Sequence, residues 1–488
     1  MAHYFILKHC GGASRPFSPD QKKMNLQRTN LLMSKVAHHP ASFKDPAGFV
    51  FEASGNFYRQ VNKVYSKQYE QLVQSGLYNR LTAGNQLLPH TIVPENLTDE
   101  ENWYTTLLPT QLPFISYPYE WCFDQLKDAA LLTLSILRTS IEFGMILKDA
   151  TPFNIQFYKG NPIFIDTLSF DNYDSNEPWA AYRQFCEGFL FPLYLEHYLK
   201  IDCIKLLSTY ITGIPVEVTA KLLPRKSKWS LGVRLHVLLQ NNIKNNNSPG
   251  KSGTRFSKQK MLNLVSHLES IIVSLKPGYP PQTTWSNYYE ETILGKGYLQ
   301  QKESLLKKIC TSLSYTTIVD LGANDGHFTR LLAEKDKLVI AIDNDSRCIN
   351  TLYQYTKQQS VSNIIALTGD LSNPTPAVGF NNTERTSFHQ RIKPDLVLAL
   401  ALVHHLAIGK NIPLSLLASY FAGFAPQLII EFVPKEDEKV KQLLSTRRDI
   451  FEDYHMAGFE KYFLEYFYIQ AKETIKGTER TLYCLIRK

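Results

Sequence analysis

The sequence predicts an α/β protein made of two unlike halves, and three observations support this fold class. A chain of 488 residues is too long for a single hydrophobic core. From residue 316 onward, apolar strand candidates alternate with helix candidates, as in a mostly parallel sheet covered by helices on both faces. Before residue 241, strand and turn patterns come first and helical patterns follow, which is an α+β order.

The N-terminal half begins with short strands around turns over residues 42–65, and a helical pattern follows over 67–84. Apolar residues at helical spacing predict a long, buried helix over residues 123–146. Two strand-like segments come next, QFYKG and PIFIDTL, and the turn residues 159–162 predict a tight hairpin between them. Further helices are predicted over 178–212 and 215–240.

The two halves are joined by residues 242–256, which are rich in Asn, Ser, Gly and Pro and predict a flexible, basic linker. An amphipathic helix is predicted over 258–275, and the breaker PGYPPQ ends it. A second helix, over about 286–313, leads into the final domain. Four aromatic residues near this helix could cover a ligand as a lid, but the core of the protein is the favoured place for them: Trp285, Tyr288, Tyr289 and Tyr298.

The C-terminal half carries five continuously apolar strand candidates: TTIVDL, LVIAIDN, IIALTGD, PDLVLALAL and QLIIEFV. Helix candidates separate them, among them RCINTLYQYTKQ and IPLSLLASYF, and EDEKVKQLLSTR follows the fifth strand. Two more strand candidates, EKYFLEYFYIQ and RTLYCLIRK, predict an antiparallel hairpin that completes the sheet. The sheet is therefore predicted to be parallel, with an antiparallel last pair.

Composition limits the classes of protein that fit this chain. Its 44% hydrophobic and 20% charged residues are typical of a globular protein. The seven cysteines are scattered and have no C-x-x-C spacing, which favours a reducing compartment and argues against a zinc site. The apolar helix candidate over 130–147 is interrupted by Arg138 and Glu142, so no membrane span is expected. The N-terminus does not resemble a secretory signal, and we expect a cytoplasmic protein.

The net charge of +8 is concentrated in one segment. No Asp or Glu occurs between Glu217 and Glu269, whereas Lys and Arg recur over residues 221–260. Such a segment could attract RNA, phospholipid or a phosphorylated partner. The favoured alternative is a solvated linker with its flanking helices, because no RNA motif with interleaved aromatic residues accompanies the charges.

The clearest motif is DLGANDG, residues 320–326, where an apolar strand ends and a helix begins. Ligands of open α/β sheets bind at this edge, where glycines let the backbone approach and helix N–H groups face the ligand. Asp343 ends the second strand, 23 residues after Asp320, and Asp370 ends the third. A carboxylate at the position of Asp343 can accept hydrogen bonds from both hydroxyls of a ribose.

This segment resembles the DxGxGxG motif of class I S-adenosylmethionine-dependent methyltransferases, with Asn324 in place of the middle glycine. Asn tolerates the left-handed conformation, so the loop can still form. A dinucleotide-binding protein is disfavoured, because DLGANDG lacks the GxGxxG pattern that cradles phosphates. The resemblance implies S-adenosylmethionine as cofactor and a contact of Asp370 with the adenine amino group. It implies this set of cofactor-binding residues: Asp320, Gly322, Ala323, Asn324, Gly326, Asp343, Asn344, Asp370 and Leu371.

The fourth strand ends in LALALVHHLA, which places His404 and His405 beside the expected cofactor. Methyl transfer depends on alignment of the nucleophile and on its deprotonation, so either histidine could be the base. The alternative is a histidine pair that caps the strand and bonds to backbone. The absence of [DNS]PP[YFW] and of a cysteine near this strand disfavours amino methylation of adenine or glutamine and C5 methylation of cytosine. We expect a small-molecule, lipid or glycan acceptor.

A second constellation lies in LKDATPFNIQFYKGNPIFIDTL, residues 147–168. KDATPFN resembles the catalytic loop of protein kinases and aminoglycoside phosphotransferases. By that resemblance Asp149 is the base, and Asn154 and Asp166 are ligands of Mg²⁺ in a site for Mg·ATP. The usual His or Arg before the catalytic Asp is Lys148, and Gly48, Gly55 and Arg59 are poor substitutes for a phosphate-gripping loop and lysine. The alternative is structural, with the two aspartates capping a turn and ending a strand.

Residues 40–488 resemble a group of bacterial two-part proteins, some of them described as nodulation-type methyltransferases. The motifs that carry this resemblance include SFKDPAGFVF, SGLYNRL, PFISYPYEW, LKDATPFNIQF, PWAAYRQFC and IIEFVPKEDEKV. The predicted organisation is an N-terminal extension (1–40), a kinase-like domain (41–241), the linker (242–256), a helical connector (257–315) and a class I methyltransferase domain (316–488).

The sequence therefore predicts an S-adenosylmethionine-dependent methyltransferase whose kinase-like domain binds or phosphorylates the acceptor. Two alternatives stay open: an RNA methyltransferase that uses the basic residues 221–260, and a pseudokinase scaffold fused to a methyltransferase. The acceptor, the oligomeric state and the true start of the chain, for which Met24 and Met33 are candidates, are not determined by these patterns.

Overall fold

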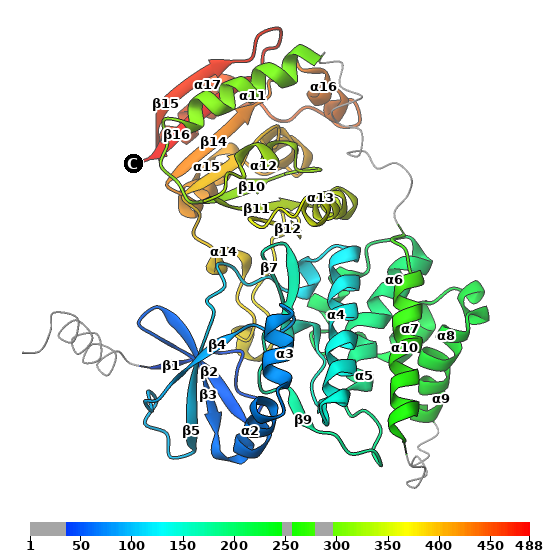
Figure 1. Ribbon diagram of the computed structural model, residues 1–488. Helices are drawn as coiled ribbons and strands as arrows, with labels where there is room; N and C mark the ends of the chain where they lie inside the picture. Colours follow the sequence, from blue (N-terminus) through cyan, green and yellow to red (C-terminus); the bar gives the residue numbers. More distant parts are fainter. Residues whose placement is uncertain (1–35, 246–255, 279–295) are drawn as a thin grey trace, which may run out of the picture. The chain divides into compact units, whose positions relative to one another are not determined.

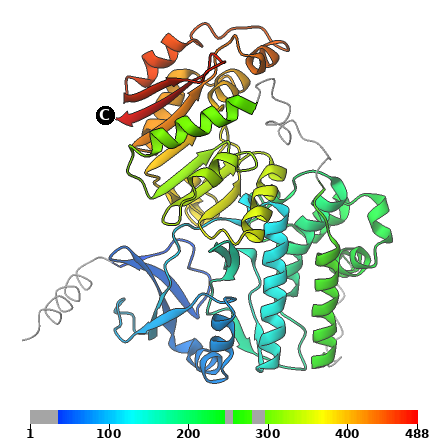
Figure 2. The same cartoon turned by 45° about the horizontal axis from the view of Figure 1, so that its top comes forward.

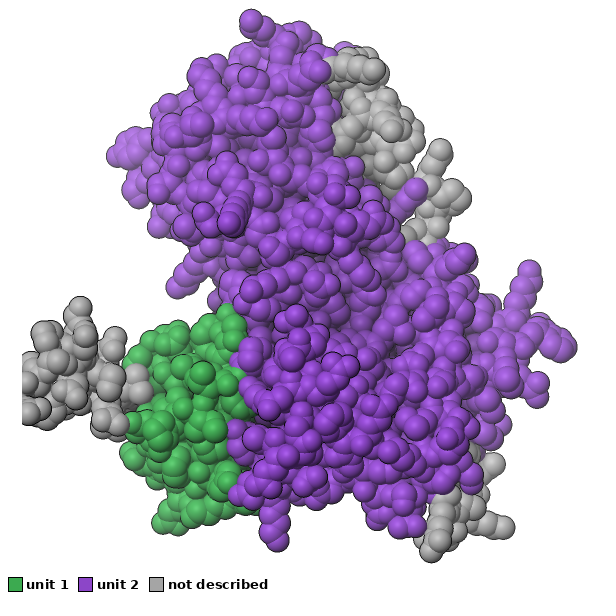
Figure 3. Space-filling model, viewed as in Figure 1, with its two compact units in different colours: residues 1–66, 90–111 green, residues 67–89, 112–488 purple. Residues whose placement is uncertain are grey.

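The structure, a computed structural model, describes residues 36–245, 256–278 and 296–488. It divides into two compact units (Figure 3). Unit 1 consists of residues 1–66 and 90–111, and unit 2 of residues 67–89 and 112–488. The predicted extension and linker lie outside the described residues for the most part, as do Trp285, Tyr288 and Tyr289.

Unit 1 is an antiparallel sheet of five strands in the order β1-β2-β3-β5-β4. The predicted strands around turns are confirmed, because β2 and β3 form a hairpin through Ser54 and Gly55, both with positive φ. Phe51 and Tyr58 stack in a small core of this sheet. The last two strands were not predicted. The strands are β1 (Ala37–His38), β2 (Gly48–Ala53), β3 (Asn56–Asn62), β4 (His90–Val93) and β5 (Trp103–Pro109).

The N-terminal part of unit 2 is built around the predicted long helix, which is α4 (Phe123–Glu142). Its apolar face is buried, including Leu126, Leu134 and Leu137. The predicted hairpin is also confirmed: β7 pairs with β8 through Lys159 and Gly160, which both have positive φ. The neighbouring elements are α2 (Ser66–Gln74), α3 (Leu77–Ala83), β6 (Met145–Leu147), β7 (Ile155–Tyr158), β8 (Asn161–Phe164) and β9 (Phe170–Asn172).

The helical patterns over 178–212 and 215–240 form shorter, interrupted helices. A π-helical turn, η4 (Cys186–Leu190), joins the first two, and there Gly188 packs so closely on Pro152 that a Cβ would lie 2.6 Å from its ring. The predicted amphipathic helix is confirmed as α10, which packs beside α4 and bonds to it through Arg138 and Glu269 (2.5 Å). These helices are α5 (Tyr182–Phe185), α6 (Phe191–Leu199), α7 (Val216–Leu222), α8 (Leu231–Val233), α9 (Leu239–Asn245) and α10 (Lys258–Ser274).

The C-terminal part of unit 2 is a seven-stranded sheet in the order β12-β11-β10-β13-β14-β16-β15. The first five strands in this order pair in parallel, and β16 runs antiparallel to both of its neighbours. This confirms the mixed sheet that the sequence predicts. The strands are β10 (Thr317–Leu321), β11 (Leu338–Asp343), β12 (Ile364–Thr368), β13 (Leu396–Ala399), β14 (Gln427–Phe432), β15 (Phe467–Thr474) and β16 (Thr481–Arg487).

Helices flank this sheet at the positions that the alternating pattern predicts (Figure 1). One expectation was wrong: the first half of EKYFLEYFYIQ is helical, because Phe459 and Phe463, one turn apart, stack on each other and are buried. The helices are α11 (Lys296–Cys310), α12 (His327–Leu332), α13 (Ser346–Gln358), α14 (Phe388–Arg391), α15 (Leu414–Phe424), α16 (Glu438–Leu444) and α17 (Met456–Phe463).

Within unit 2, the turn before α4, η2 (Pro118–Glu120), packs on β12, and α4 packs on α13 (Figure 2). Both carboxylate oxygens of Glu120 accept hydrogen bonds from the guanidinium of Arg391, and both side chains are almost fully buried. Gln125 donates to the carbonyl of Ala366 on β12 (3.0 Å), and Tyr353 on α13 donates to Asp128 on α4 (2.7 Å). The N-terminal part of unit 2 (residues 67–89, 112–245 and 256–278), which we call the helical part, therefore holds the β12 side of the sheet by polar contacts. None of the described helices is long and apolar enough to cross a membrane.

Candidate functional site

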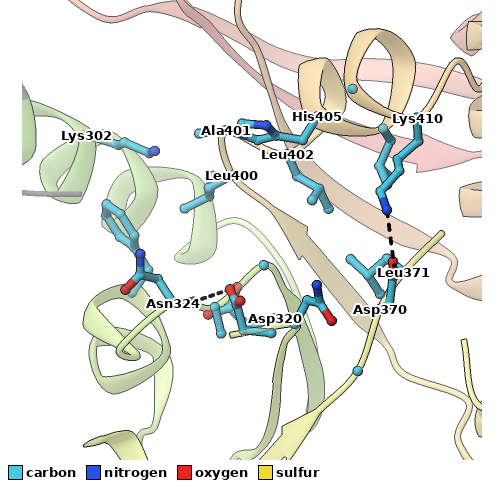
Figure 4. Close-up of a pocket in the computed structure, with 18 residues that line it drawn as sticks. Lys302, Asp320, Asn324, Asp370, Leu371, Leu400, Ala401, Leu402, His405 and Lys410 are labelled. Carbon is cyan, nitrogen blue, oxygen red and sulfur yellow. Dashed lines mark hydrogen bonds and ion pairs between the residues drawn. The ribbon is translucent and has the colours of Figure 1, made fainter. Parts of the chain in front are cut away.

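A cavity of 260 Å³ opens at the edge of the sheet where β10, β11, β12 and β13 end (Figure 4). The carboxyl ends of parallel strands meet at this edge, which is where open α/β sheets bind ligands. Of the sequence-predicted residues, nine line the cavity: Asp320, Gly322, Ala323, Asn324, Asp343, Asn344, Asp370, Leu371 and His405.

The loop after β10 is shaped by residues in the left-handed conformation. Gly322, Asn324 and Gly326 have φ of 76°, 52° and 82°, so Asn324 adopts the conformation that the motif requires. Gly322 and Ala323 both donate to the carbonyl of Ile342, which ties the loop to β11. Gly326 does not line the cavity. Its role is to start α12, where a Cβ would lie 2.4 Å from Leu352.

Of the carboxylates in the cavity wall, Asp320 is buried and Asp343 is partly buried. Asp320 accepts a hydrogen bond from the hydroxyl of Thr329 (2.6 Å), and burial raises its pKa to about 7. Asp343 accepts backbone N–H groups, from Asn324 (2.8 Å), from Asp345 (2.8 Å) and from Asn344. Burial raises the pKa of Asp343, although these backbone bonds oppose the shift. The two oxygens of Asp343 offer about four acceptor sites in all, so a site stays available for a further donor.

The third carboxylate, Asp370, lies at the end of β12 and is more exposed. It accepts from the N–H and the hydroxyl of Ser372 (2.8 and 2.6 Å), and Lys410 faces it at 3.6 Å (Figure 4). Burial raises its pKa, but the bonds from Ser372 and the charge of Lys410 outweigh this effect and leave the pKa below its ordinary value. Next to Asp343, Asn344 accepts a hydrogen bond from Lys205 of the helical part (3.1 Å).

The two histidines after β13 differ in position. His405 begins a π-helical turn, η9 (His405–Gly409), and lines the cavity. His404 is fully buried, does not line the cavity, and neither of its ring nitrogens has a hydrogen-bond partner among the described residues. The rings lie 4.0 Å apart. Burial and the charge of Arg480 lower the pKa of His405 to about 4, so its imidazole is neutral at physiological pH.

Sequence reasoning missed Lys302, which lines the cavity from α11. Its ammonium bonds to Glu431 on β14 (2.5 Å) and lies 4.8 Å from the ring centre of Phe328. Glu431 also accepts from Tyr298 (2.8 Å), which is therefore a buried residue, as favoured from the sequence. Burial lowers the pKa of Lys302, opposed by the charge of Glu431. A polar residue on an amphipathic helix gives no sign in the sequence that it will face a cavity.

The second predicted constellation also comes together. Ser169 links two of its members, because its hydroxyl donates to Asp166 (2.5 Å) and accepts from the amide of Asn154 (3.0 Å). Asp149 begins the loop and accepts from the N–H of Thr151 (3.3 Å). Burial and the charge of Asp166 raise the pKa of Asp149. Among the described residues, no group of three or more His, Cys, Asp or Glu side chains could hold a metal ion.

Comparison with known folds gave only weak likenesses. The chain is similar to magnesium protoporphyrin IX methyltransferase from Synechocystis PCC 6803 (17% identity, 39% of this chain and 84% of that chain, TM-score 0.29). It is also similar to N-methyltransferase NodS from Bradyrhizobium japonicum WM9 (13%, 39% and 97%, TM-score 0.29) and to WbdD (14%, 42% and 43%, TM-score 0.29). We base no functional assignment on similarities at these TM-scores.

Comparison of the sequences gave a full-length relative. No family model matches the chain. Nodulation protein NoeA of Rhizobium meliloti (strain 1021) is 32% identical over 463 residues, which cover 91% of this chain and 95% of that protein. A similarity of this extent includes both halves of the chain. The chain belongs to the family of nodulation protein NoeA.

Proposed function

We propose that the C-terminal half is a methyltransferase and that its cavity binds S-adenosylmethionine. The observation that carries this proposal is the convergence of Asp320, Asp343 and Asp370, from three adjacent parallel strands, on one cavity at the sheet edge. Three carboxylates suit a sulfonium cation and an adenosyl group better than the pyrophosphate of a dinucleotide, which they would repel.

The residues of the wall fit this cofactor. Asp343 is the candidate acceptor for the ribose hydroxyls, since its bonds to backbone do not use all the acceptor sites of its carboxylate. Asp370 is the candidate partner of the adenine amino group. Lys302 is the buried cation at the cavity wall, and we assign it to the carboxylate of the methionine moiety.

When bound, S-adenosylmethionine supplies a methyl group on a sulfonium, and the protein aligns the acceptor with it. His405 is the candidate base, because it lines the cavity and is neutral at physiological pH. It would take the proton from the acceptor's nucleophilic atom. His404, buried behind the wall, would then act only by supporting the ring of His405. The acceptor remains a small molecule, lipid or glycan in this proposal.

Calorimetric titration with S-adenosylhomocysteine tests the cavity. The wild-type chain is expected to bind, and Asp343→Ala is expected to lose binding because the ribose acceptor is removed. Asp325→Ala is the matched control: it changes an aspartate of the same loop that does not line the cavity. Unchanged affinity of Asp343→Ala, with a normal thermal unfolding curve, would show that the cofactor binds elsewhere.

We propose a second, kinase-like activity for the helical part of unit 2. Asp149, Asn154 and Asp166 lie close together, and this favours a kinase-like activity. Phosphoryl transfer needs a carboxylate near the attacking hydroxyl and oxygen ligands for Mg²⁺. Asn154 donates to Ser169 through its amide nitrogen, so its amide oxygen is the atom that a metal would meet. One or two protein oxygens are enough where the nucleotide phosphates supply further ligands of Mg²⁺.

Titration with Mg·ATP distinguishes an active kinase-like site from a scaffold. Heat of binding that disappears in Asp166→Ala, but persists in the control Asp174→Ala, would support a nucleotide site. Asp174 lies in the exposed loop after β9. No heat with Mg·ATP, together with normal S-adenosylhomocysteine binding, would leave a methyltransferase with an acceptor-binding module.

A further inference from the structure

An exposed surface of mixed basic and apolar character lies between the end of α7 and the start of α9. It includes the turn η6 (Arg225–Trp229), α8 and the π-helical turn η7 (Arg234–Leu238), in the green region around α8 in Figure 1. We call it the Trp229 surface. Its exposed side chains are five cations and five apolar residues: Lys221, Arg225, Lys226, Lys228, Arg234, Leu222, Trp229, Leu231, Leu235 and Leu239.

The exposed side chains project from a well-packed base. Under them Ser227 is buried and donates to the carbonyl of Pro224 (2.7 Å). Gly232 packs so tightly that a Cβ would lie 2.4 Å from the hydroxyl of Tyr194. Val233 and Val237 are fully buried. The apolar residues above this base are therefore held outward by folded structure, and they do not fill a core.

The apolar part of the surface is unusually open. Trp229 is 89% exposed and Leu231 is 61% exposed. Leu231, Leu235 and Leu239 follow one another at intervals of four residues, so they line one face of consecutive helical turns. Exposed apolar groups of this size, rimmed by charge, mark interaction sites. A tryptophan ring favours the boundary between water and hydrocarbon, where one edge is polar and the body is apolar.

The charge of the surface limits the kind of partner. No acidic residue occurs between Glu217 and Glu269, so the surface lies within an acid-free segment, and its partner should be anionic. Proteins that bind single-stranded RNA stack several bases on aromatic rings, but Trp229 is the only aromatic member of the Trp229 surface. The other four apolar members are leucines, which suit acyl chains.

We propose that the Trp229 surface docks the protein reversibly on an anionic phospholipid bilayer. The cations meet the lipid phosphates, while Trp229 and the leucines enter the boundary between headgroups and acyl chains. This is peripheral binding, and it needs no spanning helix. The proposal stands on this surface alone and is independent of the methyltransferase activity.

Co-sedimentation of the full chain with vesicles tests the proposal. The wild-type chain is expected to bind vesicles of equal parts phosphatidylcholine and phosphatidylglycerol, and to bind phosphatidylcholine alone far more weakly. The triple variant Arg225→Gln/Lys226→Gln/Lys228→Gln is expected to bind on the order of 100-fold more weakly, since each basic residue contributes about fivefold at an anionic surface. The matched control changes exposed lysines elsewhere and should bind normally: Lys307→Gln/Lys335→Gln/Lys476→Gln.

The apolar contribution is tested separately with Trp229→Phe and Trp229→Ala. Brominated acyl chains should quench tryptophan fluorescence in the wild type, and Trp229→Phe, which keeps an apolar ring, should lose most of this quenching. Trp229→Ala should weaken binding about tenfold, whereas Tyr468→Ala, which removes another exposed aromatic ring, should not. Circular dichroism confirms that each variant is folded.

Three outcomes would overturn the proposal. The first is no binding of the wild type to the anionic vesicles. The second is an equal loss of binding in the triple variant and its control, which would mean that only net charge matters. The third is retention of oligouridylate RNA by the wild type and not by the triple variant, without vesicle binding, which would assign the surface to nucleic acid.

Discussion

The buried ion pair between Glu120 and Arg391 gives a prediction about how the helical part supports the sheet. Arg391 bonds to Glu120 through two nitrogens and also donates to the carbonyl of Ile115 (2.6 Å). Both side chains are about 5% exposed or less, so water screens the pair very little. Arg391→Ala would leave the Glu120 carboxylate buried with the N–H of Tyr117 (2.9 Å) as its remaining partner in this cluster.

Removing one partner of a buried pair costs about 3–5 kcal/mol, because the other charge stays buried. The lost bond to Ile115 adds about 1 kcal/mol. We therefore expect Arg391→Ala to lower the free energy of unfolding by about 4–6 kcal/mol. Because much of that cost is the orphaned carboxylate, the double variant Glu120→Ala/Arg391→Ala should lose less than the sum of the single variants, by about 2–3 kcal/mol.

Urea unfolding followed by far-UV circular dichroism measures these differences, provided that the slope of the transition is unchanged. Lys308→Ala, which breaks an exposed pair with Glu473, is the control and should cost less than about 1 kcal/mol. The effect of Arg391→Ala should also persist in about 1 M salt, a concentration at which exposed ion pairs are screened but buried pairs are screened much less. This reasoning would be refuted if Arg391→Ala lowered the free energy of unfolding by less than about 1 kcal/mol, or if the effects of the two single variants added up to that of the double variant.

Three further predictions concern the cavity. His405→Ala should lower turnover about 10²–10⁴-fold with an acceptor, the range for loss of a general base, and leave S-adenosylhomocysteine affinity unchanged; equal turnover would exclude the base assignment. Lys302→Met should weaken S-adenosylhomocysteine binding about 10–100-fold, as expected for the loss of a hydrogen bond to a charged group, whereas Lys308→Met on the same helix should not. An equal loss of affinity in both variants would contradict a role of Lys302 in the cavity. The pKa of Asp320 is raised from 3.8 to about 7 in the folded chain, so the unfolded chain loses this proton at a lower pH than the folded chain does. The free energy of unfolding of the wild type should therefore fall relative to that of Asp320→Asn as the pH rises from 3.8 to about 7. Urea midpoints measured across this pH range test the prediction, and a constant difference between the two proteins would mean that the pKa shift is absent.

Much of the cofactor-type site could be predicted from the sequence, because its members sit at fixed points of a repeating pattern. Asp320, Asp343 and Asp370 each end an apolar strand, and the ends of parallel strands meet at one edge whatever the side chains between them. The left-handed conformation of Asn324 was likewise a local property of the loop. The spacing of Asp149, Asn154 and Asp166 predicted a second cluster, and the hairpin between β7 and β8 brings its members together.

The sequence by itself therefore determined the mixed sheet, the long helix α4 and the residues that the strand ends carry, since these depend on local periodicity and turn chemistry. Only the tertiary structure decided which polar residues of distant helices face the cavity. Lys302 reaches it because α11 packs where Glu431 can bind its ammonium, and His404 is kept from it by burial behind His405. The structure also showed that Trp229 is held outward, with 89% of it exposed. The physical reason is that periodicity specifies which face of an element is apolar, but not which surface, if any, covers that face.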